Sequence, residues 1–106
     1  MVIDSSAVVA ILLREPDAAR FARAIAKSSV RLMSAANLFE ACIVVDNLVD
    51  LRTGRRLDAF IERARIDIEP VTEHHVRIAR QAYIDFDKGN HRAALNFGDC
   101  FAYALA

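Results

Sequence analysis

The sequence contains few of the residues that interrupt or cross-link a fold. It has only three glycines and two prolines in 106 residues, which argues against long loops and flexible linkers. Its two cysteines, Cys42 and Cys100, lie far apart in apolar surroundings. We interpret them as small buried hydrophobic residues in a reducing compartment, and the sequence disfavours a disulfide between them.

Long apolar runs and excess charge of one sign are also missing. No stretch approaches the ~20 apolar residues that cross a bilayer, and no basic segment precedes an apolar run at the N-terminus. We therefore expect a cytoplasmic protein with no membrane partner. The 14 basic and 14 acidic residues balance, which argues against coating of nucleic acid by bulk charge but leaves room for a local basic patch.

What is present predicts one α/β domain. Hydrophobic residues make up 55% of the chain, enough for a core without disulfides or metals. Strand-like and helix-like segments alternate, which is typical of a central parallel sheet whose ligands bind at the carboxyl ends of the strands. We expect strands at 2–6, 30–33 and 66–71. We expect helices at 7–13, 16–27, 34–54, 56–64, 72–89 and 98–106, with one helical turn at 91–96.

The last predicted helix has no capping residue, polar taper or glycine after it. A segment of this kind should lead back to one more strand. We therefore expect residues 1–106 to form a single domain that is shortened at its C-terminus and lacks the final strand of the fold.

Three acids occupy similar places in this pattern. Asp4 ends the first strand, Glu40 lies in the first two turns of the long helix, and Asp99 begins the last helix. Each lies among apolar residues, and burying a carboxylate is costly unless it is paired or binds a metal. A hard divalent cation such as Mg²⁺ or Mn²⁺ would resolve the repulsion between gathered carboxylates. Taken singly, each acid is better explained as a helix cap or a first-turn acid facing the helix dipole, whereas the three together favour a functional site.

Three blocks of sequence resemble the motifs of PIN-domain ribonuclease toxins of the VapC type. Residues 1–12 (Met-Val-Ile-Asp-Ser-Ser-Ala-Val-Val-Ala-Ile-Leu) are similar to the first motif, and residues 34–40 (Ser-Ala-Ala-Asn-Leu-Phe-Glu) to the second. Residues 95–106 (Leu-Asn-Phe-Gly-Asp-Cys-Phe-Ala-Tyr-Ala-Leu-Ala) are similar to the third and are the most specific. The resemblance covers essentially the whole chain.

This resemblance implies a three-layer α/β/α sandwich and a Mg²⁺- or Mn²⁺-dependent endoribonuclease in a toxin–antitoxin pair. It implies that Asp4, Glu40 and Asp99 are the catalytic, metal-binding acids, and that Ser6 and Asn96 support them. The implied partners are an RNA substrate and a cognate VapB-type antitoxin, and we also expect a homodimer. Relatives continue beyond the third motif to another strand and a further acid, so the number of metals stays open.

Two other interpretations remain at this stage. The chain could be a non-catalytic PIN-like module that binds an antitoxin without cutting RNA. It could also be a phosphatase or phosphotransfer domain with Asp4 as nucleophile, because a strand-end aspartate serves that chemistry as well. Such a domain needs a lysine at a later strand end, and Lys27 and Lys88 are poorly placed for that role.

Overall fold

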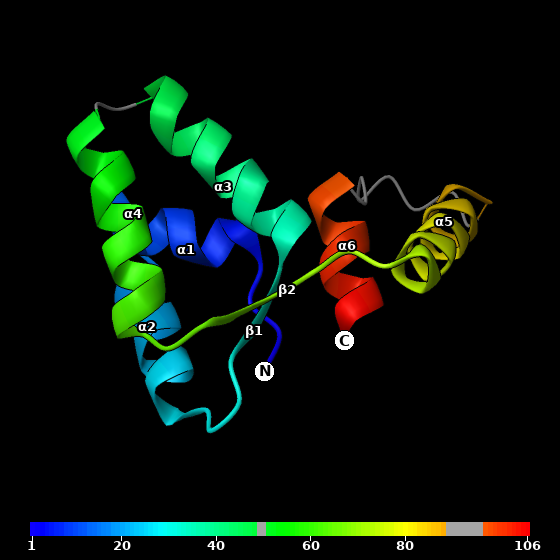
Figure 1. Cartoon of the computed structure of the whole chain (residues 1–106), viewed down its shortest axis with the longest axis horizontal. Helices are drawn as coiled ribbons and strands as arrows, with labels where there is room; N and C mark the ends of the chain where they lie inside the picture. Colours follow the sequence, from blue (N-terminus) through cyan, green and yellow to red (C-terminus); the bar gives the residue numbers. More distant parts are fainter. Residues whose placement is uncertain (49–50, 89–96) are drawn as a thin grey trace.

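The computed structural model describes residues 1–48, 51–88 and 97–106. Their helices lie on both sides of a small parallel sheet, with α1, α2 and α4 on one side and α5 and α6 on the other (Figure 1). The elements are α1 (Ser5–Leu12), α2 (Ala18–Lys27), β1 (Leu32–Ser34), α3 (Ala35–Leu48), α4 (Leu51–Arg63), β2 (Asp67–Glu69), α5 (Glu73–Lys88) and α6 (Phe97–Leu105).

The sheet is built around β1. β1 pairs in parallel with β2, with Met33 opposite Ile68. The N-terminal segment pairs with β1 through a parallel bridge from Val2 to Leu32, and Ile3 N donates to Leu32 O at 2.7 Å. This arrangement confirms the predicted α/β fold with a parallel sheet. It also brings the end of the N-terminal segment beside the end of β1.

The predicted first strand, residues 2–6, is much shorter in the structure. Only Val2 makes a bridge, and α1 already begins at Ser5. Asp4 is the reason, because its side chain accepts the backbone N–H of Ser5 and so satisfies a donor that the first turn of a helix leaves unpaired.

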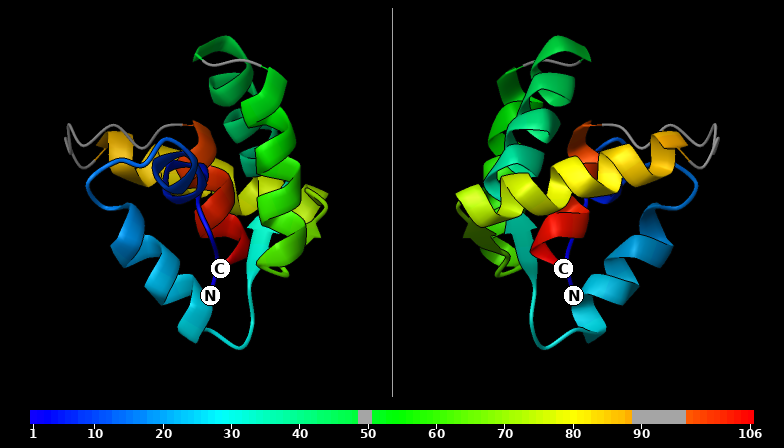
Figure 2. Two further views of the ribbon diagram at one scale, coloured as in Figure 1. Left: turned by 90° about the vertical axis from the view of Figure 1, so that its left-hand side faces the viewer. Right: turned by 90° about the vertical axis from the view of Figure 1, so that its right-hand side faces the viewer.

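Two groups of buried side chains hold the layers together. The larger joins α1, α3, α4 and the sheet, and its fully buried members include Val8, Met33 and Val45. The smaller joins α5 to α6 through Ala79, Cys100 and Ala104. Figure 2 shows how these two helices are arranged. α1 is apolar nearly all round, as the sequence predicted, and contacts α2, α3 and α4. Each large apolar side chain buried here stabilises the fold by about 1.5–3 kcal/mol.

The long helix predicted over 34–54 is divided in the structure, and that prediction was wrong. α3 ends at Leu48, and Gly54 lies inside α4 rather than at a helix end. A Cβ at Gly54 would lie 3.0 Å from Asp46 Oδ1, so the glycine lets α4 approach α3 closely. Here glycine serves helix packing, which the sequence pattern does not distinguish from a helix stop.

Two arginines end helices in the left-handed conformation. Arg14 follows α1 with φ 54°, and Arg65 follows α4 with φ 52°. In both cases the arginine N–H bonds to the carbonyl three residues back, and the next N–H bonds to the carbonyl five residues back. This is the Schellman arrangement, which glycine usually occupies because a Cβ costs roughly 1 kcal/mol there.

Arg31 connects the ends of two helices through its guanidinium group. Nη1 donates to Ala64 O at 2.6 Å, Nη2 to Ala26 O at 3.1 Å, and Nε to Ser28 O at 3.0 Å. Ala26 lies in the last turn of α2, and Ala64 directly follows α4. A cation at these carbonyl ends is favoured by both helix dipoles, so Arg31 ties α2 and α4 together beside β1.

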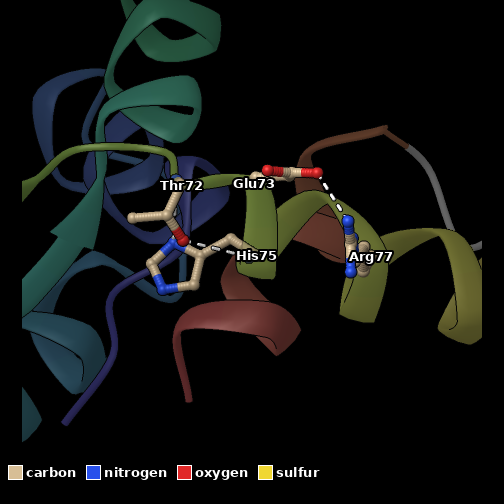
Figure 3. Close-up of polar contacts among 4 residues, drawn as sticks. All are labelled: Thr72, Glu73, His75 and Arg77. Atoms are coloured by element: carbon tan, nitrogen blue, oxygen red, sulfur yellow. Dashed lines mark hydrogen bonds and ion pairs between the residues drawn. The ribbon is translucent and has the colours of Figure 1, made fainter.

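The start of α5 is capped as the sequence predicted. Thr72 Oγ1 accepts the backbone N–H of His75 at 3.1 Å, and Glu73 pairs with Arg77 at 2.6 Å one turn later (Figure 3). The predicted end of this helix at Gly89 and the predicted turn at 91–96 lie outside the described residues. Among the described helices, none has both the length and the hydropathy of a membrane span.

Candidate functional site

The three predicted acids line one pocket of about 350 Å³. Asp4 reaches it from the N-cap of α1, Glu40 from the second turn of α3, and Asp99 from the first turn of α6. These helices meet because α3 packs on both α1 and α6. The other residues that line the pocket are Ser5, Ser6, Val9 and Val44.

Asp4 is held by hydrogen bonds at both carboxylate oxygens. Oδ1 accepts the backbone N–H of Ser5 at 2.8 Å, and Oδ2 accepts the hydroxyl of Ser6 at 2.8 Å. Asp4 is therefore a helix cap, as the alternative interpretation required, and it also lines the pocket. Because Asp4 caps α1 and lines the pocket at the same time, its role as a cap does not exclude a role in the site.

Ser5 connects two of the acids and was not singled out from the sequence. Its side chain is buried, and its Oγ contacts both Glu40 Oε1 and Asp4 Oδ1, the latter at 3.3 Å. The hydroxyl has a single hydrogen to donate, so it can serve only one carboxylate at a time. The sequence offered one sign of this role, since Ser5 adjoins Asp4 in a run of two serines.

Asn37 was also missed and lies deeper than the acids. It is fully buried, and its Nδ2 donates to Asp4 Oδ1 at 3.3 Å and to Gly98 O at 2.9 Å. Its Oδ1 has no hydrogen-bond partner among the described residues. The available signal was its spacing, because Asn37 and Glu40 are three residues apart and share a face of α3.

Gly98 brings the backbone of α6 against Glu40. A Cβ at Gly98 would lie 2.3 Å from Glu40 Oε1 and 2.7 Å from Oε2, well inside contact distance. The glycine of the Asn-Phe-Gly-Asp run thus leaves room for the Glu40 carboxylate beside Asp99. Asn96, which the sequence offered as a supporting residue, lies outside the described residues.

The chemistry of the pocket suits a hard cation. Its walls carry carboxylate and hydroxyl oxygens, and no Lys or Arg is among the described residues that line it. Within the described ranges, no three His, Cys, Asp or Glu side chains already surround a point that could hold a metal ion. The structure therefore brings the three acids to one pocket without forming a finished coordination shell.

The surroundings of the two cysteines do not activate either thiol as a nucleophile. Both are free thiols. Burial raises the pKa of Cys42, with further contributions from the carboxylates of Asp46 and Asp58. Burial likewise raises the pKa of Cys100, and the adjacent Asp99 adds to the effect. A raised pKa keeps the thiol protonated at neutral pH, as expected of small hydrophobic residues.

Comparison with known proteins supplies the family. The profile of the PIN domain family matches residues 1–106. The chain is 51% identical over 107 residues to ribonuclease VapC28 of Mycobacterium tuberculosis, covering all of this chain and 80% of that protein. It is 46% identical over 106 residues to ribonuclease VapC30 of the same species, covering 81% of that protein.

A third relative agrees with these two. The chain is 47% identical over 106 residues to ribonuclease VapC of Mycolicibacterium smegmatis, and covers 82% of that protein. The similarity extends over the whole chain, including all three blocks that carry the acids. The chain therefore belongs to the PIN domain family, among the proteins of the VapC type.

Proposed function

We propose that this chain is a metal-dependent endoribonuclease, the toxin of a toxin–antitoxin pair, in which Asp4, Glu40 and Asp99 hold Mg²⁺ or Mn²⁺. The observation that carries the proposal is the common pocket of these acids, which come from three separate helices and from sequence blocks about 36 and 59 residues apart. The relatives named ribonuclease support the substrate class.

A cation explains how an acidic pocket could act on RNA. Two carboxylates about 4 Å apart repel each other by roughly 1 kcal/mol in water and by more when partly buried. An RNA phosphate would meet the same repulsion. Asp4 and Asp99 with Glu40 would hold the ion, which when bound stabilises charge on a phosphodiester oxygen and makes water easier to deprotonate.

The chain's own residues prepare the site. Ser5 and Ser6 donate hydrogen bonds to both oxygens of the Asp4 carboxylate, so the start of α1 helps to orient it before any ligand binds. Glu40 is set by α3 and by the hydroxyl of Ser5. Groups held in place in this way do not have to be ordered during the reaction, which is the advantage of a site built on rigid elements.

The test is Mn²⁺ binding by calorimetry together with cleavage of an RNA substrate, on the original chain and on Asp4→Asn, Glu40→Gln and Asp99→Asn. We expect each variant to fold, to bind Mn²⁺ at least tenfold more weakly, and to lose most cleavage. Asp67→Asn is the matched control, because Asp67 is an exposed acid on β2 away from the pocket. Full cleavage by folded Asp99→Asn would contradict the assignment.

The proposal includes an antitoxin of the VapB type as a protein partner, acting in the cytoplasm where RNA is found. An apolar groove of about 230 Å³ supports this, because it runs from Phe21 and Ile25 of α2 to Asp4 and Ser6. An amphipathic segment lying there would reach the acids. Co-purification with the antitoxin, and its loss in Phe21→Asp, would test this part.

We also propose a homodimer. Phe39 and Ile43 are 67% and 43% exposed and lie one turn apart on α3, so they form an apolar strip beside Glu40. Light scattering on the purified chain should give twice the monomer mass, and Phe39→Glu should shift it toward the monomer. A monomer for the original chain would refute this point alone.

The other two interpretations make different predictions in the same assays. A non-catalytic module would bind the antitoxin but not cleave RNA at any Mn²⁺ concentration. A phosphatase would release phosphate from p-nitrophenyl phosphate and need a nearby lysine. Lys27, one of the two lysines in the sequence, is exposed in the last turn of α2 and does not line the acidic pocket.

A further inference from the structure

Asn37 lies where the parts of the pocket meet. Its helix, α3, carries Glu40 one turn later, and its side chain touches the two segments that carry the other acids. One contact is to the carboxylate of Asp4, and the other is to the backbone carbonyl of Gly98, directly before Asp99. A single amide therefore connects segments that are 94 residues apart in the chain.

The two contacts require a nitrogen that carries at least two hydrogens, which the side-chain amide of Asn37 supplies without adding a charge. A carboxylate and a carbonyl are both acceptors, so only a group with two hydrogens to donate can satisfy both from one side-chain atom. This chemistry also fixes which end of the amide faces them, an assignment that the heavy atoms alone would leave open. The amide oxygen then points the other way, where it finds no partner among the described residues.

The unpaired oxygen indicates that asparagine at position 37 does not maximise the stability of the fold. Buried polar groups without a partner are rare in folded proteins, and each one lowers the stability of the fold. Asn37 is fully buried, so its oxygen has no route to bulk water. An apolar residue would avoid this cost but would remove one donor from Asp4 Oδ1 and one from Gly98 O.

We propose that Asn37 is a positioning residue that aligns Asp4 and the start of α6 with Glu40. This rests on the proposed function, since it concerns the geometry of that same site. Asn37 touches neither substrate nor cation in this role and acts through Asp4 and Gly98. Partners that orient metal ligands typically change metal affinity or activity by 10- to 100-fold when they are removed.

The experiment compares Asn37→Leu, Asn37→Asp and Asn37→Thr with the original chain. Aspartate has nearly the shape and volume of asparagine, and leucine has the same branching with a larger volume; neither leucine nor an ionised aspartate donates a hydrogen bond, whereas threonine keeps one hydroxyl donor. Asn47→Leu is the matched control, because Asn47 is an exposed asparagine on the same helix. All rates are measured well below each variant's melting temperature, so that loss of fold does not lower them.

We expect Asn37→Leu and Asn37→Asp to bind Mn²⁺ 10- to 100-fold more weakly by calorimetry. We also expect kcat to fall about 100-fold with KM for RNA changed less than threefold. Asn37→Thr should recover part of both losses, and Asn47→Leu should match the original chain. A residue that only stabilised the fold would lower the melting temperature without this pattern.

A folded Asn37→Leu that binds Mn²⁺ and cleaves RNA within twofold of the original chain would overturn the inference. NMR of the Asn37 side-chain amide distinguishes its failure from failure of the proposed function. In the metal-free chain these protons should exchange slowly and shift in Asp4→Ala. If they do so and the original chain neither binds Mn²⁺ nor cleaves RNA, the proposed function is wrong and the contact is structural. Fast exchange and no shift would overturn the positioning role directly.

Discussion

Gly98→Ala should separate activity from stability. The added Cβ would lie 2.3 Å from Glu40 Oε1, whereas ordinary contact begins at 3.4 Å, so the carboxylate must move by about 1 Å. A glutamate side chain can make this movement at little cost to the fold. Alanine also favours a helix over glycine by roughly 0.5–1 kcal/mol, and Gly98 lies in α6.

The expected result is a protein at least as stable as the original but a much poorer ribonuclease. A 1 Å misplacement of a catalytic group can lower the rate about 100-fold, which corresponds to about 2.7 kcal/mol in the activation barrier. The assays are thermal unfolding by circular dichroism and kcat/KM for cleavage of a fluorescent RNA substrate, both with Mn²⁺ present.

Gly54→Ala is the matched control for this variant. It makes the same substitution inside a helix, and its Cβ would meet the Asp46 carboxylate at 3.0 Å, away from the three acids. We expect its kcat/KM to stay within twofold of the original. If Gly98→Ala also keeps full activity, then the position of Glu40 against α6 does not matter to catalysis and the reasoning fails.

Three predictions concern the fold. Arg31→Lys should lower the free energy of unfolding by about 2 kcal/mol, because a lysine cannot reach three carbonyls at once. Urea unfolding measures this loss, and an unchanged midpoint would contradict the prediction. Arg14→Gly should stabilise the chain by about 0.5–1 kcal/mol because it relieves a left-handed residue, so its melting temperature should rise by a few degrees rather than fall. Thr72→Ala should cost about 1 kcal/mol through loss of the α5 cap, whereas the exposed Thr72→Ser should be nearly neutral in the same urea titration.

The sequence predicted most of the fold because its signals are local. The apolar run of α1, the break before Pro16 and the Thr72 cap each depend on residues close together in the chain, and the structure confirms them. Gly54 misled the prediction because a helix stop and a close helix contact both call for a residue without a side chain. Only the approach of α3 distinguishes the two cases.

The sequence singled out the three acids that line the pocket, but it did not indicate the hydrogen bonds that join them through Ser5 and Asn37. Asp4, Glu40 and Asp99 stood out because an acid among apolar residues is costly unless it has a purpose. Ser5 and Asn37 did not stand out, since a serine at a helix start and an asparagine inside a helix are ordinary in sequence. Their importance depends on which way the side chains point once α1, α3 and α6 have packed together.

The wide spacing of the acids also has a consequence for synthesis of the protein. A nascent chain that has been made only as far as α5 contains Asp4 and Glu40 but not Asp99, and it has no α6 to pack on β1 and α3. Domains generally fold as units during synthesis, so a domain is not complete until its last element has been made. The order of synthesis therefore delays completion of the pocket until Asp99, the last of its three acids along the chain, has been made and α6 has packed on α3.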